Sequence, residues 1–167
     1  MSDYQLEKIY DGRHSDWNDQ VPRLWVLHAD KIPPHIGISV EGSYFSLKAN
    51  GKDEGLPIEL LLFVLNKKLI KTISFEVRAS FTAQKAAFVF DKFTSTVPNE
   101  TSCLAPIKEL LDIDSANQLN DVLIALDTKN RIVNTVGFNI PKDFKNFKKY
   151  TMEDVHARLK LLANNND

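Results

Sequence analysis

Short apolar runs, bounded by turn-forming residues, divide the middle of the chain into predicted strands. Residues 23–28 are rich in aromatic and β-branched side chains and are followed by the Pro33-Pro34 pair, which is typical of a strand. Residues 35–49 contain two such runs around Glu41-Gly42, which predicts a β-hairpin with a tight turn. Apolar and polar positions alternate over 69–78, so we expect a further strand there.

Apolar positions recur at helical spacing in four segments, which are 57–65, 82–93, 102–111 and 151–162. Pro57 suits a first helical turn, because the amide that it lacks would have no partner there. Thr82 and Ser102 are suitable N-caps for the second and third helices. The last helix opens with Thr151-x-x-Asp154, which is close to the capping-box pattern.

The remaining segments complete a one-domain layout. We predict an irregular arm over 1–22, a single domain over 23–163 and a polar tail over 164–167. Within the domain, the polar residues 50–55 predict a loop, and 119–126 and 132–140 predict two more strands. The fold class expected is α+β, with an antiparallel sheet packed against helices.

The composition changes the picture mainly by exclusion. The 167 residues include 43% apolar positions and carry a formal charge of −1, so the chain can form a core and has no overall field to collect nucleic acid. One cysteine excludes an intramolecular disulfide and a cysteine-rich zinc site, and we predict no metal and no cofactor. The run 60–65 is too short to cross a bilayer, and the first eight residues do not resemble an export signal, so we expect a cytoplasmic protein without a membrane span.

The residues that could carry chemistry are one thiol and one imidazole. Cys103 lies near the start of the third predicted helix, where unpaired N–H groups and the helix dipole favour a thiolate. His35 opens the predicted hairpin and is the candidate proton acceptor. A third polar group would hold the imidazole in place, and the returning strand offers three alternatives, Ser46, Lys48 and Asn50.

Each candidate also has a purely structural interpretation. A single cysteine on the apolar face of a helix is commonly a small buried hydrophobe, and the residue types alone favour that role for Cys103. The lysines of 142–150 alternate with aromatic residues and could touch a phosphate backbone, although a solvated face explains them on a chain of this charge. Nucleic acid is therefore not an expected partner.

The order of the predicted elements resembles that of a known group, the circularly permuted papain-like cysteine hydrolases. This permuted branch of the NlpC-type superfamily includes relatives of lecithin retinol acyltransferase. The similar stretches are 24–27, 35–40 with 44–49, 73–77, 82–93, and Ser102-Cys103-Leu104 with the apolar positions behind it. His35 precedes Cys103 by 68 positions (103 − 35), which is the permuted order.

The resemblance implies an activity, and the chain also departs from the family pattern. It implies a cysteine hydrolase or acyltransferase that acts on an amide, ester or thioester. Such an enzyme is a peptidase, an amidase or an acyltransferase, and its substrate is a peptide or an acyl compound. The chain has Pro22-Arg23 where the family commonly has Gly-Asp, and Ser102 where Asn or Tyr usually precedes the cysteine. If Glu41-Gly42 is a two-residue turn, Lys48 lies across from His35 and lowers the pKa of the imidazole.

A different class of function stays open beside catalysis. The same fold could serve as a non-catalytic module that binds a partner protein through aromatic anchors, for which the candidates are Trp17, Trp25, Tyr44 and Phe45. That hypothesis predicts a buried and inert Cys103.

Overall fold

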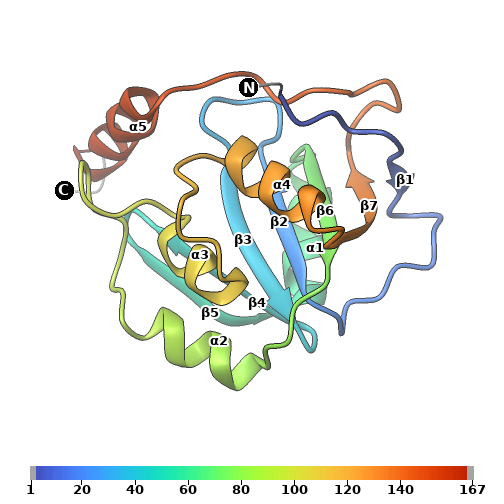
Figure 1. Cartoon of the computed structure of the whole chain (residues 1–167), viewed down its shortest axis with the longest axis horizontal. Helices are drawn as coiled ribbons and strands as arrows, with labels where there is room; N and C mark the ends of the chain where they lie inside the picture. Colours follow the sequence, from blue (N-terminus) through green and yellow to red (C-terminus); the bar gives the residue numbers. More distant parts are fainter. Residues whose placement is uncertain (1–2, 165–167) are drawn as a thin grey trace.

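A seven-stranded sheet forms the centre of the protein in a computed structural model that describes residues 3–164. The strand order is β1-β7-β6-β2-β3-β4-β5 (Figure 1). The strands are β1 (Tyr10–Asp11), β2 (Arg23–Leu27), β3 (His35–Val40), β4 (Ser43–Lys48), β5 (Gly51–Pro57), β6 (Thr72–Val77) and β7 (Ile132–Phe138). Neighbouring strands are antiparallel except β1 and β7, which are parallel. The α+β class is confirmed, with a mixed sheet instead of a fully antiparallel one.

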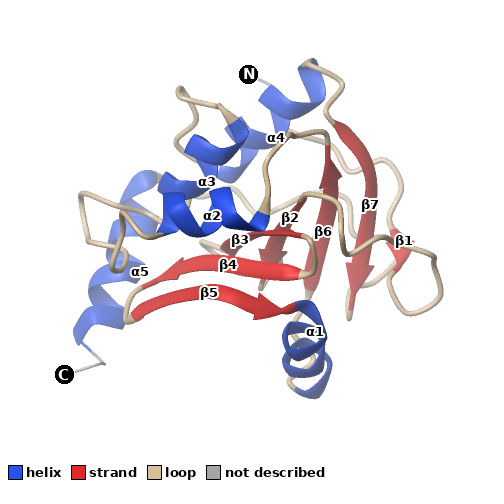
Figure 2. Ribbon diagram, turned by 90° about the horizontal axis from the view of Figure 1, so that it is seen from below, coloured by secondary structure: helices blue, strands red, loops and turns tan. Residues whose placement is uncertain are grey.

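Five helices accompany the sheet, and they are α1 (Ile58–Lys67), α2 (Ala83–Phe90), α3 (Ala105–Leu111), α4 (Leu119–Thr128) and α5 (Met152–Asn164). In Figure 2, α2, α3 and α4 lie on one face of the sheet and α1 lies on the other. Helix α5 lies beside the end of the sheet where β4 stops and β5 begins. Two layers of helices around a sheet allow both sheet faces to be buried.

Each face of the sheet has its own apolar core, because successive side chains of a strand point to opposite sides. Ile36 and Ile38 of β3 join the larger core, which α2, α3 and α4 cover. Trp25 of β2 and Tyr44 of β4 belong to the second core, which α1 covers. Both cores extend to the end of the sheet at which β3 begins.

The β3–β4 hairpin forms as predicted. Glu41 and Gly42 have φ values of 52° and 74°, and positive φ at both central residues is the requirement of a type I′ turn. The turn sets the register, in which Gly37 pairs with Ser46. The pairing ends there, so the predicted position of Lys48 opposite His35 lies two residues beyond the last pair of the hairpin.

The prediction of a strand over 119–126 is wrong, because this segment forms α4. Its buried residues are Leu119, Val122, Leu123 and Leu126, a spacing that fits one face of a helix. A capping box at Gln118 and Asp121 starts the helix, with the Asp121 carboxylate accepting the Gln118 N–H at 3.1 Å. The apolar positions of this segment fit both the two-residue period of a strand and the 3.6-residue period of a helix. The capping box favours the helix.

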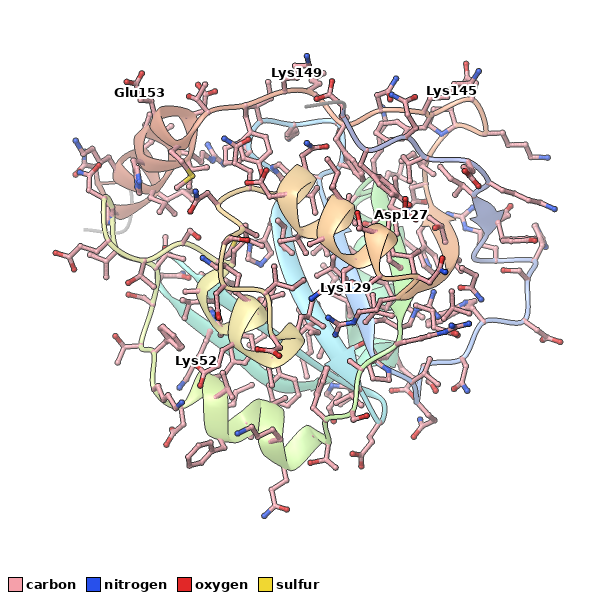
Figure 3. All side chains as sticks on the ribbon, in the orientation of Figure 1. Lys52, Asp127, Lys129, Lys145, Lys149 and Glu153 are labelled. Carbon is pink, nitrogen blue, oxygen red and sulfur yellow. The ribbon has the colours of Figure 1, made fainter. Side chains whose placement is uncertain are left out.

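The prediction of a loop over 50–55 is also wrong, because residues 51–57 form the edge strand β5. Pairing with β4 supplies the backbone hydrogen bonds of this strand, and the polar sequence alone does not indicate that pairing. Lys52 connects this strand to α2 by donating to the carbonyls of Phe90 and Phe93, each at 3.0 Å. Figure 3 shows Lys52 between the edge of the sheet and α2.

The other elements follow the predictions with shifted ends. Helix α1 begins after Pro57, and Thr82 caps α2 by accepting the Lys85 N–H at 3.1 Å. Thr151 and Asp154 form the reciprocal hydrogen bonds of a capping box at the start of α5. Most of the predicted arm is irregular, but it contributes β1 to the sheet. Of the predicted tail, Asn164 ends α5, and residues 165–167 lie outside the described residues.

Candidate functional site

A cavity of about 510 Å³ opens at the end of the sheet, beneath α5. Its wall is formed by the loop between β2 and β3, the start of β3, the end of β4, the segment before α3, Tyr150 and one face of α5. This volume lies within the range of small-molecule sites. His35, Lys48, Asn50 and Cys103 all line it.

The wall takes side chains from both faces of the sheet. His35 and Lys48 lie on the face that carries Tyr44 and α1, because they share its side of the hairpin. Cys103 packs with the core of the opposite face, the one that includes Ile36. The thiol and the imidazole therefore reach the cavity around the end of β3, from opposite sides of the strand.

The sequence pattern predicts Cys103 in the first turn of the third helix. In the structure it lies in a turn just before that helix. Helix α3 begins at Ala105 with Leu104 as the N-cap. Ser102 organises this turn, because its Oγ accepts the Leu104 N–H at 3.3 Å and its carbonyl accepts the Ala105 N–H at 3.2 Å. The difference arises because Pro106 needs an early position in the helix, and that fixes where α3 starts.

The surroundings of Cys103 favour the neutral thiol. Burial raises the pKa of the thiol above its usual range, because a thiolate is poorly solvated there. The backbone N–H groups of Ile36 and Cys103 face the sulfur and oppose part of this rise. Ile36 directly follows His35, but within the described residues no hydrogen bond joins the Cys103 sulfur to the imidazole, whose Nε2 has no partner.

The surroundings of His35 favour the neutral imidazole. The pKa of His35 is lowered to about 4, mainly by burial; Asp53 acts in the opposite direction, and Lys48 and His28 add to the lowering. The Nε2 atom is enclosed and has no hydrogen-bond partner in the part of the chain that the structure describes. Lys48 therefore has the predicted effect on the pKa, although burial is the larger cause. At neutral pH the ring is uncharged, and its lowered pKa makes it a weaker base than an ordinary histidine.

The three alternatives for the third polar residue have different places. Ser46 is fully buried outside the cavity and donates to Oδ2 of Asp53 at 3.0 Å. Lys48 donates to Oδ1 of the same carboxylate at 3.2 Å. Asn50 is exposed in the turn between β4 and β5. Among the described residues, none of the three forms a hydrogen bond with His35.

Asp53 is the functional candidate that the sequence pattern missed. It lies on β5 opposite Ser46, and it is the carboxylate that stabilises a proton on His35. The residue belongs to the segment predicted as a loop, so no face could be assigned to it. Lys52, Asp53 and Glu54 are three consecutive charged residues, so the sequence offers no alternation of polar and apolar positions that could have indicated a strand.

The aromatic anchors of the interaction hypothesis are core residues. Trp25, Tyr44 and Phe45 are at most 2% exposed, so they offer no surface to a partner. Trp17 packs edge-on against Trp25, with ring centroids 5.8 Å apart. The prediction that these residues are anchors for a partner is therefore wrong, because they pack in or against the two cores.

The lysine-rich segment 142–150 uses its aromatic residues internally. Phe144 and Phe147 pack against the larger core, and Tyr150 accepts the Leu119 N–H at 2.8 Å through its hydroxyl. Lys149 pairs with Asp3 at 3.2 Å. These rings are not free to stack on nucleotide bases, which sequence-tolerant binding of single strands requires.

Two further properties hold for the part of the chain that the structure describes. Within residues 3–164, no three His, Cys, Asp or Glu side chains gather closely enough to hold a metal ion. None of the helices in the same range has the length and apolar character needed to cross a bilayer.

Comparisons with protein-family models, with curated proteins and with solved structures find no match for this chain.

Proposed function

We propose that the protein is a cysteine hydrolase or acyltransferase in which Cys103 attacks the carbonyl of an amide, ester or thioester. The observation that supports this most is the convergence of the thiol and the imidazole on one cavity of small-molecule size, from segments 68 positions apart. Among the described residues the buried Nε2 of His35 has no hydrogen-bond partner, so it does not yet contact the Cys103 sulfur. The proposal therefore requires the thiol and the imidazole to approach each other, or to be bridged by one water, when the substrate binds. The resemblance to the permuted papain-like hydrolases supplies the reaction class.

In the proposed reaction the resting pair is a neutral thiol and a neutral imidazole. His35 accepts the proton of the thiol while the sulfur attacks the carbonyl carbon, and it then returns that proton to the leaving group. Water or a second acceptor releases the acyl group from the sulfur. The raised pKa of the thiol and the lowered pKa of His35 agree with the neutral resting pair. Both shifts also make the proton transfer less favourable, so in the proposed reaction the proton leaves the thiol while the sulfur attacks and not before.

The oxyanion that forms during the attack needs backbone donors near the sulfur. The amides of Leu104 and Ala105 already donate to Ser102, and Pro106 has no N–H, so the first turn of α3 offers little. The amides of Cys103 and Ile36 face the sulfur instead. We assign the oxyanion to these two donors, because preorganised amides stabilise developing charge strongly.

Asp53 would act on this reaction through His35. As a carboxylate that favours the protonated ring, it stabilises the imidazolium that forms when the proton leaves the thiol. Ser46 and Lys48 hold both of its oxygens. In the proposed mechanism Asp53 is thus a positioning residue that acts through its charge. It has the role of the third polar residue, for which the sequence offered Ser46, Lys48 and Asn50.

Trapping of the acyl-enzyme tests the proposal. The protein is mixed with p-nitrophenyl butyrate, release of p-nitrophenolate is followed, and the acylated residue is identified by peptide mass spectrometry. We expect a burst with the butyryl group on Cys103, no burst in Cys103→Ala, and a rate about a hundredfold lower in His35→Gln, the usual size of a general-base contribution.

His14→Gln is the matched control, because His14 is an exposed histidine outside the cavity and should acylate at the wild-type rate. The proposal fails if Cys103 carries no acyl group. It also fails if His35→Gln acylates Cys103 as fast as the wild type, because the thiol would then act without the imidazole.

A further inference from the structure

The charged residues of the cavity wall are all of one sign. Lys31, Lys48 and Arg158 line the cavity, while no aspartate or glutamate among residues 3–164 does so. The whole chain is close to neutral, with 21 basic and 22 acidic residues, so the wall does not simply reflect the composition. A cavity with cations alone favours an anionic ligand.

Two of these cations are not neutralised by carboxylates. Lys48 pairs with Asp53, whereas Lys31 and Arg158 form no ion pair within the described residues. Lys31 comes from the loop between β2 and β3, and Arg158 comes from α5. Burial is the main cause of the lowered pKa of His28, another wall residue, and both cations lower it further, so their charges act on the same part of the cavity. Asp30 acts on His28 in the opposite direction, but it does not line the cavity and its carboxylate pairs with Lys71.

The rest of the wall around these cations is largely apolar. Ile32, Pro33 and Pro34 belong to the same loop as Lys31, and Val155, Leu159 and Leu162 belong to the same helix as Arg158. Thr96 also lines the cavity and is 6% exposed, and its buried Oγ1 has no hydrogen-bond partner among residues 3–164. An apolar wall with few polar groups that fix orientation is the usual character of a ligand site.

We infer that the substrate is a small acyl compound with an apolar body and an acidic group, and that Lys31 and Arg158 bind the acidic group. The apolar body lies along the loop between β2 and β3 and the inner face of α5. The carbonyl group then lies toward Cys103. This inference rests on the proposed function for the statement that the ligand is a substrate, and on the cavity itself for the chemistry of the ligand.

Binding without turnover tests the inference separately from catalysis. The Cys103→Ala protein is titrated with octanoate and with the neutral octanamide by isothermal titration calorimetry. We expect octanoate to bind about tenfold more tightly, since partly exposed cations contribute modestly to each ion pair. The preference should decrease as salt is added, because screening weakens exposed charge interactions.

The double variant Lys31→Gln/Arg158→Gln, made in the same background, should bind octanoate and octanamide equally. Both side chains are exposed, so the variant is expected to fold. Lys142→Gln/Lys160→Gln removes the same number of charges from exposed positions outside the cavity and should keep the preference.

The two proposals fail in different ways. Equal affinity for octanoate and octanamide in the parent protein, or no binding of either compound, overturns the anionic ligand even if acylation of Cys103 is observed. A preference for octanoate that also survives in Lys31→Gln/Arg158→Gln overturns the assignment to these cations. A preference that depends on them, without any acylation of Cys103, supports the ligand chemistry and refutes the catalytic proposal.

Discussion

Replacement of His35 by glutamine should remove much of the dependence of stability on pH between pH 6.5 and 4. An unfolded histidine has a pKa near 6.5, and burial lowers that of His35 to about 4 in the folded protein. Between these values the unfolded chain binds a proton at His35 that the folded chain does not bind. The free energy of unfolding of the wild type therefore falls as the pH is lowered through this window.

The size of the effect follows from the shift in pKa. Each pKa unit corresponds to 1.36 kcal/mol, so a change from 6.5 to about 4 makes the wild type about 3 kcal/mol less stable at pH 4 than above pH 6.5. His35→Gln has no proton to bind and should lack this loss, whatever its stability at pH 7. A domain is stable by only about 5–15 kcal/mol, so the effect is readily measured.

The assay is urea denaturation at a series of pH values, followed by tryptophan fluorescence. Trp25 is fully buried and Trp17 packs against it, so unfolding changes the surroundings of both indoles. The carboxylates that titrate near pH 4 are common to both proteins and cancel in the difference. If the free energies of the two proteins stay parallel from pH 7 to pH 4, the pKa of His35 is not lowered in the folded protein, and the enclosed position of the imidazole is refuted.

Three further substitutions test the packing around the site. Gly37→Ala should lower the free energy of unfolding in denaturant by about 1–3 kcal/mol, because its Cβ would lie 2.3 Å from the Tyr44 hydroxyl oxygen. An unchanged free energy of unfolding would contradict this packing. Asp121→Ala should cost about 1 kcal/mol by thermal or urea unfolding, because it removes the acceptor of two amides at the start of α4, and Asp127→Ala at the other end of that helix is its control. Leu159→Ala should speed hydrogen exchange in α5 but not in β3, because Val155 and Leu159 are the buried residues that attach this helix; equal acceleration in both would show that α5 unfolds only with the sheet.

The local parts of the fold were predictable because each has a sequence signal that acts over a few residues. Glu41-Gly42 permits the positive φ values of a tight hairpin, and Thr151 and Asp154 complete each other's hydrogen bonds across one helical turn. The helical spacing of Leu119, Val122 and Leu126 was equally readable, but Leu123 and Ile124 also fit a strand pattern. The Asp121 cap is the signal that resolves this ambiguity.

The parts that could not be predicted depend on long-range contacts. Strand β5 has the composition of a loop and becomes a strand because β4 is beside it, so the position of Asp53 relative to His35 followed only from the fold. Lys31 and Arg158 are 127 positions apart (158 − 31), and nothing local indicates that α5 returns to the loop between β2 and β3. The residue types of the candidate pair were readable from the sequence, while the character of the cavity was not.

The two margins of the sheet also determine how one copy of this protein meets another. A strand with free peptide groups on one side can template the strand of a neighbouring molecule, and natural proteins counter this with charge or with very short margins. Here β5 carries Lys52, Asp53 and Glu54, and the opposite margin is the two-residue β1. Both edges therefore carry features that disfavour the addition of a strand from a second copy.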